Sequence, residues 1–167
     1  WGTNIVNALE RFNIKKLYCF DLNAENLNEI KKKFPFIIKV RTLKELLKID
    51  LDGIIIATNT SSHFQIAKKC LLANHNIFVE KPVTNSFKKL KELKKIAKVK
   101  NKIIMGGYIY NYNIYINYIK KVLDKKLLGS LRYMSFERLN LGPVRNDVSC
   151  IWDLASHDIS TAIYLLK

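Results

Sequence analysis

The sequence predicts a doubly wound α/β fold, in which helices cover both faces of a parallel sheet. Short apolar runs of strand-forming residues alternate with longer stretches whose apolar residues recur with the period of a helix. The strand-like runs are apolar throughout, which is typical of strands buried on both faces of a parallel sheet. Together the two patterns predict a layered α/β domain.

This first domain is expected to span residues 1–107. Ser, Thr and Asn residues mark its helix starts, and runs of Ile, Val and Phe mark its strands. In chain order the predicted elements are helix Gly2–Arg11, strand Leu17–Phe20, helix Ala24–Lys33, strand Phe36–Ile38, helix Leu43–Ile49, strand Gly53–Ala57, a helix capped by Ser61 or Ser62 and ending at Ala73, strand Ile77–Val79, helix Ser86–Val99 and strand Lys102–Met105.

The rhythm changes after Gly107, and residues 108–167 are predicted to begin a second domain of the α+β class. The expected elements are a helix from about Asn113 to Leu127 that stops at Gly129, a strand at Leu131–Arg138 and a helix near Trp152–Leu166. The strand alternates apolar and polar residues, which suits a mixed or antiparallel sheet. Too few strands remain to complete that sheet, so we expect this domain to be incomplete.

Composition narrows the classes of protein. No apolar run approaches the roughly 20 residues of a membrane-spanning helix, so no membrane partner is expected. The net charge of +15 comes from lysines spread along every predicted helix, which indicates solvated helix faces and not a nucleic-acid site. Cys19, Cys70 and Cys150 are far apart in apolar contexts, which predicts no disulfide, no metal site and a reducing cytoplasm.

The tripeptide Glu80-Lys81-Pro82 is the most informative motif, because it directly follows the predicted strand Ile77–Val79. Ligands of open parallel sheets bind at the carboxyl ends of the strands. Pro82 favours an extended backbone at Lys81, so the ammonium group is presented from a fixed position. The alternative is a surface lysine before a turn.

An acidic residue at a second strand end points to a nucleotide. Asp21 lies 19 residues after Gly2, close to the interval of about 20 residues between a dinucleotide-binding glycine loop and the acidic residue that binds the ribose. Trp1-Gly2 would then be the end of that loop, with its earlier glycines and the first strand missing. The alternative for Asp21 is a turn-forming aspartate.

A third strand end carries Thr58, Asn59 and Thr60, with His63 in the first turn of the next helix. His63 could line a pocket or be a partly exposed polar residue. Tyrosines interleaved with asparagine between Tyr108 and Tyr115 could stack on bases, but packing explains them equally well.

With these pieces placed, nearly the whole chain resembles the Gfo/Idh/MocA family, the nicotinamide-dependent sugar and inositol oxidoreductases related to glucose-fructose oxidoreductase. The order and spacing of several motifs carry the resemblance: Trp1-Gly2, Phe20-Asp21, Ile56-Ala57-Thr58-x-Thr60-x-x-His63, Val79-Glu80-Lys81-Pro82, Tyr112-Asn113, Gly129-x-Leu131-Arg132-Tyr133 and Trp152-Asp153-Leu154-Ala155-x-His157-Asp158. The segment 137–145 looks most like members that act on nucleotide-linked or amino sugars.

The resemblance implies a Rossmann-type first domain that binds NAD, with NADP less favoured because of Asp21, and a cleft for a sugar, nucleotide sugar or cyclitol between the domains. The implied cofactor-binding residues are Trp1, Gly2, Asp21, Thr58, Asn59, Thr60, His63, Glu80 and Lys81. The implied substrate-binding residues are Tyr112, Asn113, Arg138 and Asn140.

The resemblance also places Lys81, Asp153 and His157 at the reacting carbon. Asp153 and His157 are four residues apart at a helix start, so both project from one face, and the carboxylate can orient the imidazole. His157 is then the general base for a substrate hydroxyl, and Lys81 stabilises the charge on the same oxygen. A helix-capping aspartate beside a packed histidine is the alternative.

Departures from the family pattern limit what this stretch can do alone. The resemblance implies further segments at both ends, so we expect no turnover from this polypeptide by itself and a homo-oligomer for the full-length protein. Ile114 replaces the proline that often follows the Tyr-Asn pair. Two rival functions remain, a catalytically silent nucleotide-binding relative that acts as a binding or regulatory protein, and a basic nucleic-acid-binding module.

Overall fold

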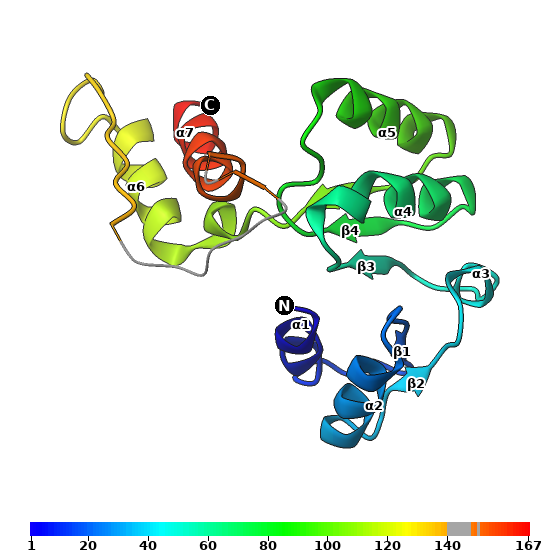
Figure 1. The fold of residues 1–167 in the computed structure, drawn as a ribbon. Helices are drawn as coiled ribbons and strands as arrows, with labels where there is room; N and C mark the ends of the chain where they lie inside the picture. The colour runs from blue at the N-terminus through cyan, green and yellow to red at the C-terminus, as the bar shows by residue number, and fades with distance from the viewer. Residues whose placement is uncertain (140–147, 150) are drawn as a thin grey trace.

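The computed structural model describes residues 1–139, 148–149 and 151–167. Helices and short strands alternate along the chain up to Gly106, and helices follow after it (Figure 1). Every strand pairing among these residues is parallel, which confirms the predicted α/β class. No helix of the described residues is long and apolar enough to cross a membrane.

The strands form two sheets among the described residues, where the sequence predicted one. One sheet pairs β1 (Tyr18–Cys19) with β2 (Ile38–Lys39), and the other has the order β3 (Ile54–Ile56), β4 (Ile77–Val79) and β5 (Ile104–Gly106). Figure 1 shows the β1–β2 sheet with its helices as a separate lobe below the larger sheet.

Helices α4 (Thr60–Leu72) and α5 (Phe87–Val99) pack side by side on the larger sheet and form the main core with it (Figure 1). The sequence predicted helix α5 from Ser86, and Ser86 is its N-cap, where its side chain accepts a hydrogen bond from the Lys89 N–H. The core consists of the apolar faces of these elements: Ile54, Ile56, Phe64, Ala67, Cys70, Leu71, Ile77, Val79, Val83, Leu93 and Ala97.

The other face of this sheet is partly exposed. Ile55, Phe78 and Met105 lie in one register row across the three strands, and Ile55 and Met105 are 41% and 37% exposed. The expectation that the strands are buried on both faces is therefore wrong for the described chain. The apolar pattern of the strands predicted helices on both faces of the sheet, whereas α4 and α5 cover one face only.

The short α3 (Leu43–Leu46) follows the smaller lobe in the chain, and Leu47 at its end packs against the main core. The smaller lobe itself contains α1 (Gly2–Leu9) and α2 (Ala24–Lys33). Its core is small and consists of Val6, Phe34 and Ile37. Asn23 caps α2 and Thr42 caps α3 through side-chain oxygens that accept backbone N–H bonds. The helices α1 and α3 end earlier than predicted, at Leu9 and Leu46.

The regular elements described after Gly107 are all helical turns or helices. They comprise the 3₁₀ turn η1 (Ile109–Tyr112), α6 (Ile114–Asp124), the π-helical turn η2 (Ile151–Ala155) and α7 (Ser156–Leu166). The helices α6 and α7 pack together, and the Tyr164 hydroxyl donates to Asn117 Oδ1 at 2.7 Å. Lys126 and Gly129 adopt positive φ values of 52° and 77°, which a helix cannot continue through.

Two local predictions are wrong. The expected strand Leu131–Arg138 is neither strand nor helix, because no described strand lies beside it to complete a hydrogen-bond ladder, and Tyr133 is 83% exposed. Helix α4 begins at Thr60 with Asn59 as its cap position, ahead of the predicted serine caps. Ser62 instead donates from its hydroxyl to the Asn59 carbonyl within the first turn.

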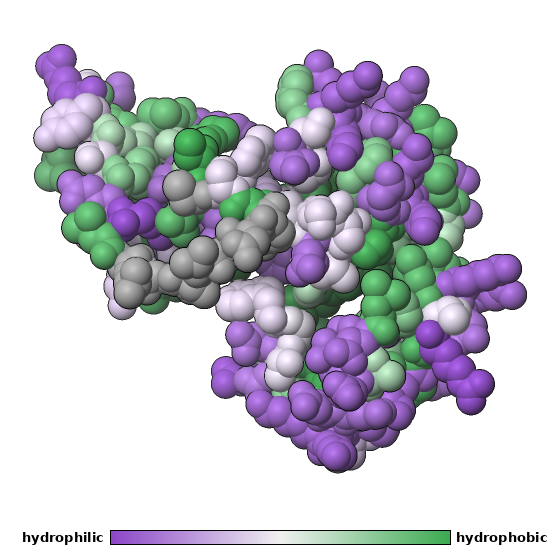
Figure 2. Space-filling model, viewed as in Figure 1, coloured by the Kyte–Doolittle hydropathy of each residue, from purple (hydrophilic) through white to green (hydrophobic). Residues whose placement is uncertain are grey.

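The helices differ in how hydrophobic their exposed surfaces are. Hydrophilic residues cover most of the smaller lobe and α5, whereas hydrophobic residues show among hydrophilic ones over α6 and α7 (Figure 2). The exposed large aliphatic and aromatic side chains on α6 and α7 are Ile114, Tyr115, Tyr118, Ile119, Ile159, Ile163 and Leu166.

Candidate active site

The parallel strands bring several polar residues to one edge of the larger sheet. β3 leads into Thr58 and Asn59, and β4 leads directly into Glu80 and Lys81. Because β3 and β4 pair in parallel register, these residues lie at the same carboxyl edge, where open α/β sheets bind their ligands.

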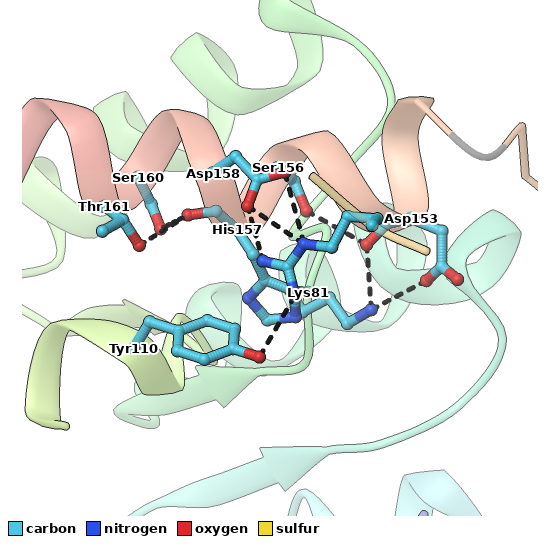
Figure 3. Close-up of polar contacts among 9 residues, drawn as sticks. Lys81, Tyr110, Asp153, Ser156, His157, Asp158, Ser160 and Thr161 are labelled. Carbon is cyan, nitrogen blue, oxygen red and sulfur yellow. Dashed lines mark hydrogen bonds and ion pairs between the residues drawn. The ribbon is translucent and has the colours of Figure 1, made fainter. Parts of the chain in front are cut away.

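Lys81 forms the central contact of this edge. Its ammonium Nζ donates to Asp153 Oδ1 at 2.7 Å and to the Asp153 carbonyl at 3.0 Å. The two side chains are 20% and 21% exposed, so water screens this ion pair only in part. Figure 3 shows Lys81 extending from the sheet edge toward Asp153 at the start of the last helical segment. The contact joins residues 72 positions apart.

Asp153 is held by the π-helical turn η2. Its backbone N–H donates to the Ser149 carbonyl at 3.0 Å. The sequence predicted Asp153 as the partner of His157, whereas the structure directs its Oδ1 to Lys81. Lys81 and Asp153 both act on the charge of His157, since Lys81 lowers its pKa and Asp153 raises it.

His157 is buried at 8% exposure on the first turn of α7. Its ring packs edge-on against the ring of Tyr110, with centroids 5.0 Å apart and an interplanar angle of 90°, a favourable geometry for aromatic rings. Nδ1 of His157 has no hydrogen-bond partner among the described residues.

Burial and neighbouring cations lower the pKa of His157 below its ordinary value. Burial is the largest cause, and the charges of Lys81 and Arg138 act in the same direction, while Asp158 and Asp153 oppose them. The ring is therefore neutral at neutral pH, which is the form that can accept a proton.

Arg138 forms a polar cluster with Asp158 and Tyr110. Its Nε and Nη2 donate to the Asp158 carboxylate, and its Nη1 donates to the Tyr110 hydroxyl at 3.2 Å. These hydrogen bonds, the one to Asp158 most of all, raise the pKa of Arg138 above its ordinary value. The sequence named Arg138 as a substrate contact but missed Tyr110 and Asp158. Asp158 directly follows His157 in the motif. Tyr110 lies in the tyrosine-rich run between Tyr108 and Tyr115, which packing explains as well as base stacking does.

His63 is buried at 1% exposure, so the interpretation as a partly exposed residue is wrong. Its Nδ1 lies 2.9 Å from the Pro82 carbonyl, and its Nε2 lies 2.9 Å from the Thr58 carbonyl. His63 thus connects the segments that follow β3 and β4. A neutral imidazole donates through one nitrogen only, so one of these contacts lacks a proton in the neutral ring.

The expected cofactor-binding residues at the edge are linked by hydrogen bonds. The indole Nε1 of Trp1 donates to Glu80 Oε1 at 2.7 Å, and the backbone N–H of Lys81 donates to Glu80 Oε2 at 3.2 Å. Thr58 Oγ1 shares a 2.7 Å hydrogen bond with Ser62, and Thr60 is buried. The start of α1 therefore lies against the end of β4.

Gly2 and Asp21 each have open space around them. Apart from its chain neighbours and the backbone of its own helix, no atom of the described chain lies within 4 Å of the place where a Cβ on Gly2 would stand. Asp21 is exposed just after β1, and its Oδ1 accepts the Asn23 N–H at 2.8 Å. A helix start with open space and a carboxylate at the next strand end fit a dinucleotide. A Cβ on Gly107 would instead meet Glu80 Oε2 at 3.1 Å, so the chain directly after β5 passes close to the Glu80 side chain.

The predicted substrate residues are placed differently from one another. Tyr112 is 66% exposed and lines an apolar cavity of about 140 Å³ with Phe78, Met105, Ile109 and others; Lys81, Asp153 and His157 do not line this cavity. Asn113 caps α6 by accepting the Tyr115 N–H at 2.9 Å. Asn140 lies outside the described residues.

Residues 4–108 match the family GFO_IDH_MocA, described as an oxidoreductase family with an NAD-binding Rossmann fold. The chain therefore belongs to this family of NAD-binding oxidoreductases. No cluster of three or more side chains suited to hold a metal ion occurs in the part of the chain that the structure describes.

Individual relatives agree with the family and its fold. A UDP-N-acetylglucosamine 3-dehydrogenase of Acidithiobacillus ferrooxidans is 28% identical over 87% of this chain and 45% of its own length. A probable dehydrogenase from Thermotoga maritima superposes with a TM-score of 0.84 at 18% identity, over 99% of this chain and 52% of that one. GenD2 from gentamicin A biosynthesis, solved in complex with NAD, has a TM-score of 0.79 at 17% identity, over 98% and 49%. The chain spans about half the length of these relatives.

We predict that His63→Phe lowers the free energy of unfolding by about 1–3 kcal/mol, because the ring can no longer donate to the carbonyl of Thr58 or Pro82 while its volume is roughly kept. Urea unfolding monitored by circular dichroism measures the change. His75→Phe is the matched control: His75 is slightly less buried and its contact with the Leu47 carbonyl is longer, at 3.1 Å, so its loss is expected to be smaller. Equal stability of His63→Phe and the wild type would contradict the connecting role.

Proposed function

We propose that this chain is the cofactor-binding and catalytic part of an NAD-dependent oxidoreductase that interconverts a hydroxyl and a carbonyl group on a sugar, a nucleotide sugar or a cyclitol. One observation carries the proposal: the Lys81–Asp153 ion pair at the strand edge lies beside a buried, neutral His157. An ammonium and an unprotonated imidazole are the two groups that such a reaction requires at one oxygen.

The proton of the substrate hydroxyl goes to His157 in the oxidising direction. Its lowered pKa keeps the ring able to accept that proton at and below neutral pH. Lys81 donates a hydrogen bond to the same oxygen and stabilises its negative character as the carbonyl forms. Asp153 holds the Lys81 ammonium in place through two hydrogen bonds.

The nicotinamide cofactor, when bound, accepts or returns the hydride. Its dinucleotide would be held by Trp1, Gly2, Asp21, Thr58, Asn59, Thr60, Glu80 and Lys81. The exposed Asp21 carboxylate favours NAD, because it can accept from the ribose hydroxyls and repels a 2′-phosphate. His63 supports this edge from beneath through the Thr58 and Pro82 carbonyls.

The substrate class rests on Tyr112, Asn113, Arg138 and Asn140 as contacts and on the related UDP-N-acetylglucosamine 3-dehydrogenase, which supports a nucleotide-linked or amino sugar. The compartment and assembly expected from the sequence, a reducing cytoplasm and a homo-oligomer, belong to this proposal. The two described cysteines are free thiols, and the exposed apolar residues of α6 and α7 would suit a subunit interface. Turnover is expected from the full-length protein.

We predict that the full-length protein binds NAD at least about tenfold more tightly than NADP, because juxtaposing Asp21 with a 2′-phosphate costs more than about 1.4 kcal/mol. Asp21→Ala should remove most of this difference. Asp52 is an exposed aspartate just before β3, at the opposite edge of the larger sheet, and Asp52→Ala should leave the preference unchanged. Calorimetric titration with each cofactor measures the preference, and tighter binding of NADP to the wild type would refute the role of Asp21.

We predict that Lys81→Met and His157→Asn each lower kcat/KM of the full-length enzyme by about two to four orders of magnitude, because each removes a group that acts on the reacting oxygen. The assay follows NADH absorbance with a panel of nucleotide sugars, amino sugars and cyclitols. Lys68→Met serves as the control, since Lys68 forms an exposed ion pair with Glu92 between α4 and α5. Nearly full turnover of Lys81→Met or His157→Asn would show that the mechanism is wrong.

A further inference from the structure

The cluster around Arg138 closes a ring of contacts with His157. Asp158 follows His157 on α7 and binds the Arg138 guanidinium, which in turn binds the Tyr110 hydroxyl. The guanidinium carbon also lies 5.2 Å from the centroid of the Tyr110 ring, within the range of a cation–π contact. The same Tyr110 ring packs edge-on against His157 (Figure 3).

A catalytic imidazole is usually oriented by a hydrogen bond at the nitrogen that faces away from the substrate. The buried Nδ1 of His157 has no such partner among the described residues. Packing against a neighbouring ring is a second way to orient an imidazole. In the described chain the Tyr110 ring packs edge-on against His157.

We propose that Tyr110, Arg138 and Asp158 are positioning residues that hold the His157 ring in one orientation and set the charge around it. This inference rests on the proposed function for its catalytic meaning. It gives Arg138 a role in addition to the substrate contact proposed above. Three elements contribute, since Tyr110 comes from η1, Arg138 from the segment after α6, and Asp158 from α7. We call these three residues the His157 clamp.

The charges that face His157 have opposite signs. Lys81 at the end of β4 and Arg138 of the clamp lower its pKa, whereas Asp158 of the clamp and Asp153 of η2 raise it. Arg138 and Asp158 thus act on His157 in opposite directions while they neutralise each other. Removing one partner of this ion pair leaves the charge of the other uncompensated.

This opposition provides a test that does not require activity. The chain has three histidines, so side-chain ¹⁵N spectra recorded across pH resolve each titration, and a His157→Gln sample assigns the signal of His157. Asp158→Asn is expected to shift the midpoint of His157 to lower pH, and Arg138→Met to higher pH. Loosening of the structure alone would raise both midpoints, because exposure to water removes the burial that lowers the pKa.

A matched control comes from α6. Asp124→Asn removes a carboxylate that pairs with Lys120 at 2.6 Å, in an i,i+4 ion pair elsewhere in the fold, and should leave the His157 titration unchanged. His63 and His75 are buried, so unchanged signals from them show that each variant is folded. If Asp158→Asn fails to fold, the Arg138→Met shift still decides.

The ¹⁵N shifts of the ring also report its tautomer. The neutral wild-type ring is expected to show one dominant tautomer, and Tyr110→Leu should move the two nitrogen shifts toward the average of a free imidazole. A wild-type ring that averages both tautomers, or midpoints that rise in both charge variants, would overturn the clamp. These spectra concern the protein without substrate, so they test the clamp independently of activity. If they confirm the clamp but the Lys81→Met enzyme is fully active, the clamp stands and the proposed function is rejected.

Discussion

The ion pair between Lys81 and Asp153 is the interaction on which the arrangement of the site depends. It fastens the end of β4 to η2, and η2 leads directly into α7, which carries His157. With side chains about one-fifth exposed, the pair is screened less than the surface pair Lys68–Glu92, whose side chains are 38% and 42% exposed. Partial shielding strengthens the attraction, and a second hydrogen bond to the Asp153 carbonyl fixes its geometry.

Local sequence signals predicted the elements whose partners are near in the chain. The strand Ile77–Val79 and the helix that ends at Val99 follow from short-range patterns, and the structure confirms both. Failures arose where the outcome depends on a distant partner. Leu131–Arg138 has the alternation of a strand but no described neighbour to pair with, and Ile55 has the apolar character of a covered residue without a described cover.

The candidate site shows the same division. Lys81, Asp153 and His157 could be named from motifs, and the structure brings them to one region. The partner of Asp153 could not be named, because helical spacing pointed to His157 whereas the fold supplies Lys81 from 72 residues away. Tyr110 and Asp158 carry no motif of their own for this role. Their contribution becomes visible only when Arg138 connects them across three elements.

The central claim is that Lys81 and Asp153 act on each other across the fold, and a double-mutant cycle tests it most directly. The free energies of unfolding of Lys81→Met, Asp153→Asn and the double variant should give a coupling of about 1–3 kcal/mol. The same cycle on Lys68 and Glu92, an ion pair of 2.6 Å that is more exposed, should give about 1 kcal/mol or less. Additive effects of Lys81→Met and Asp153→Asn would contradict the account.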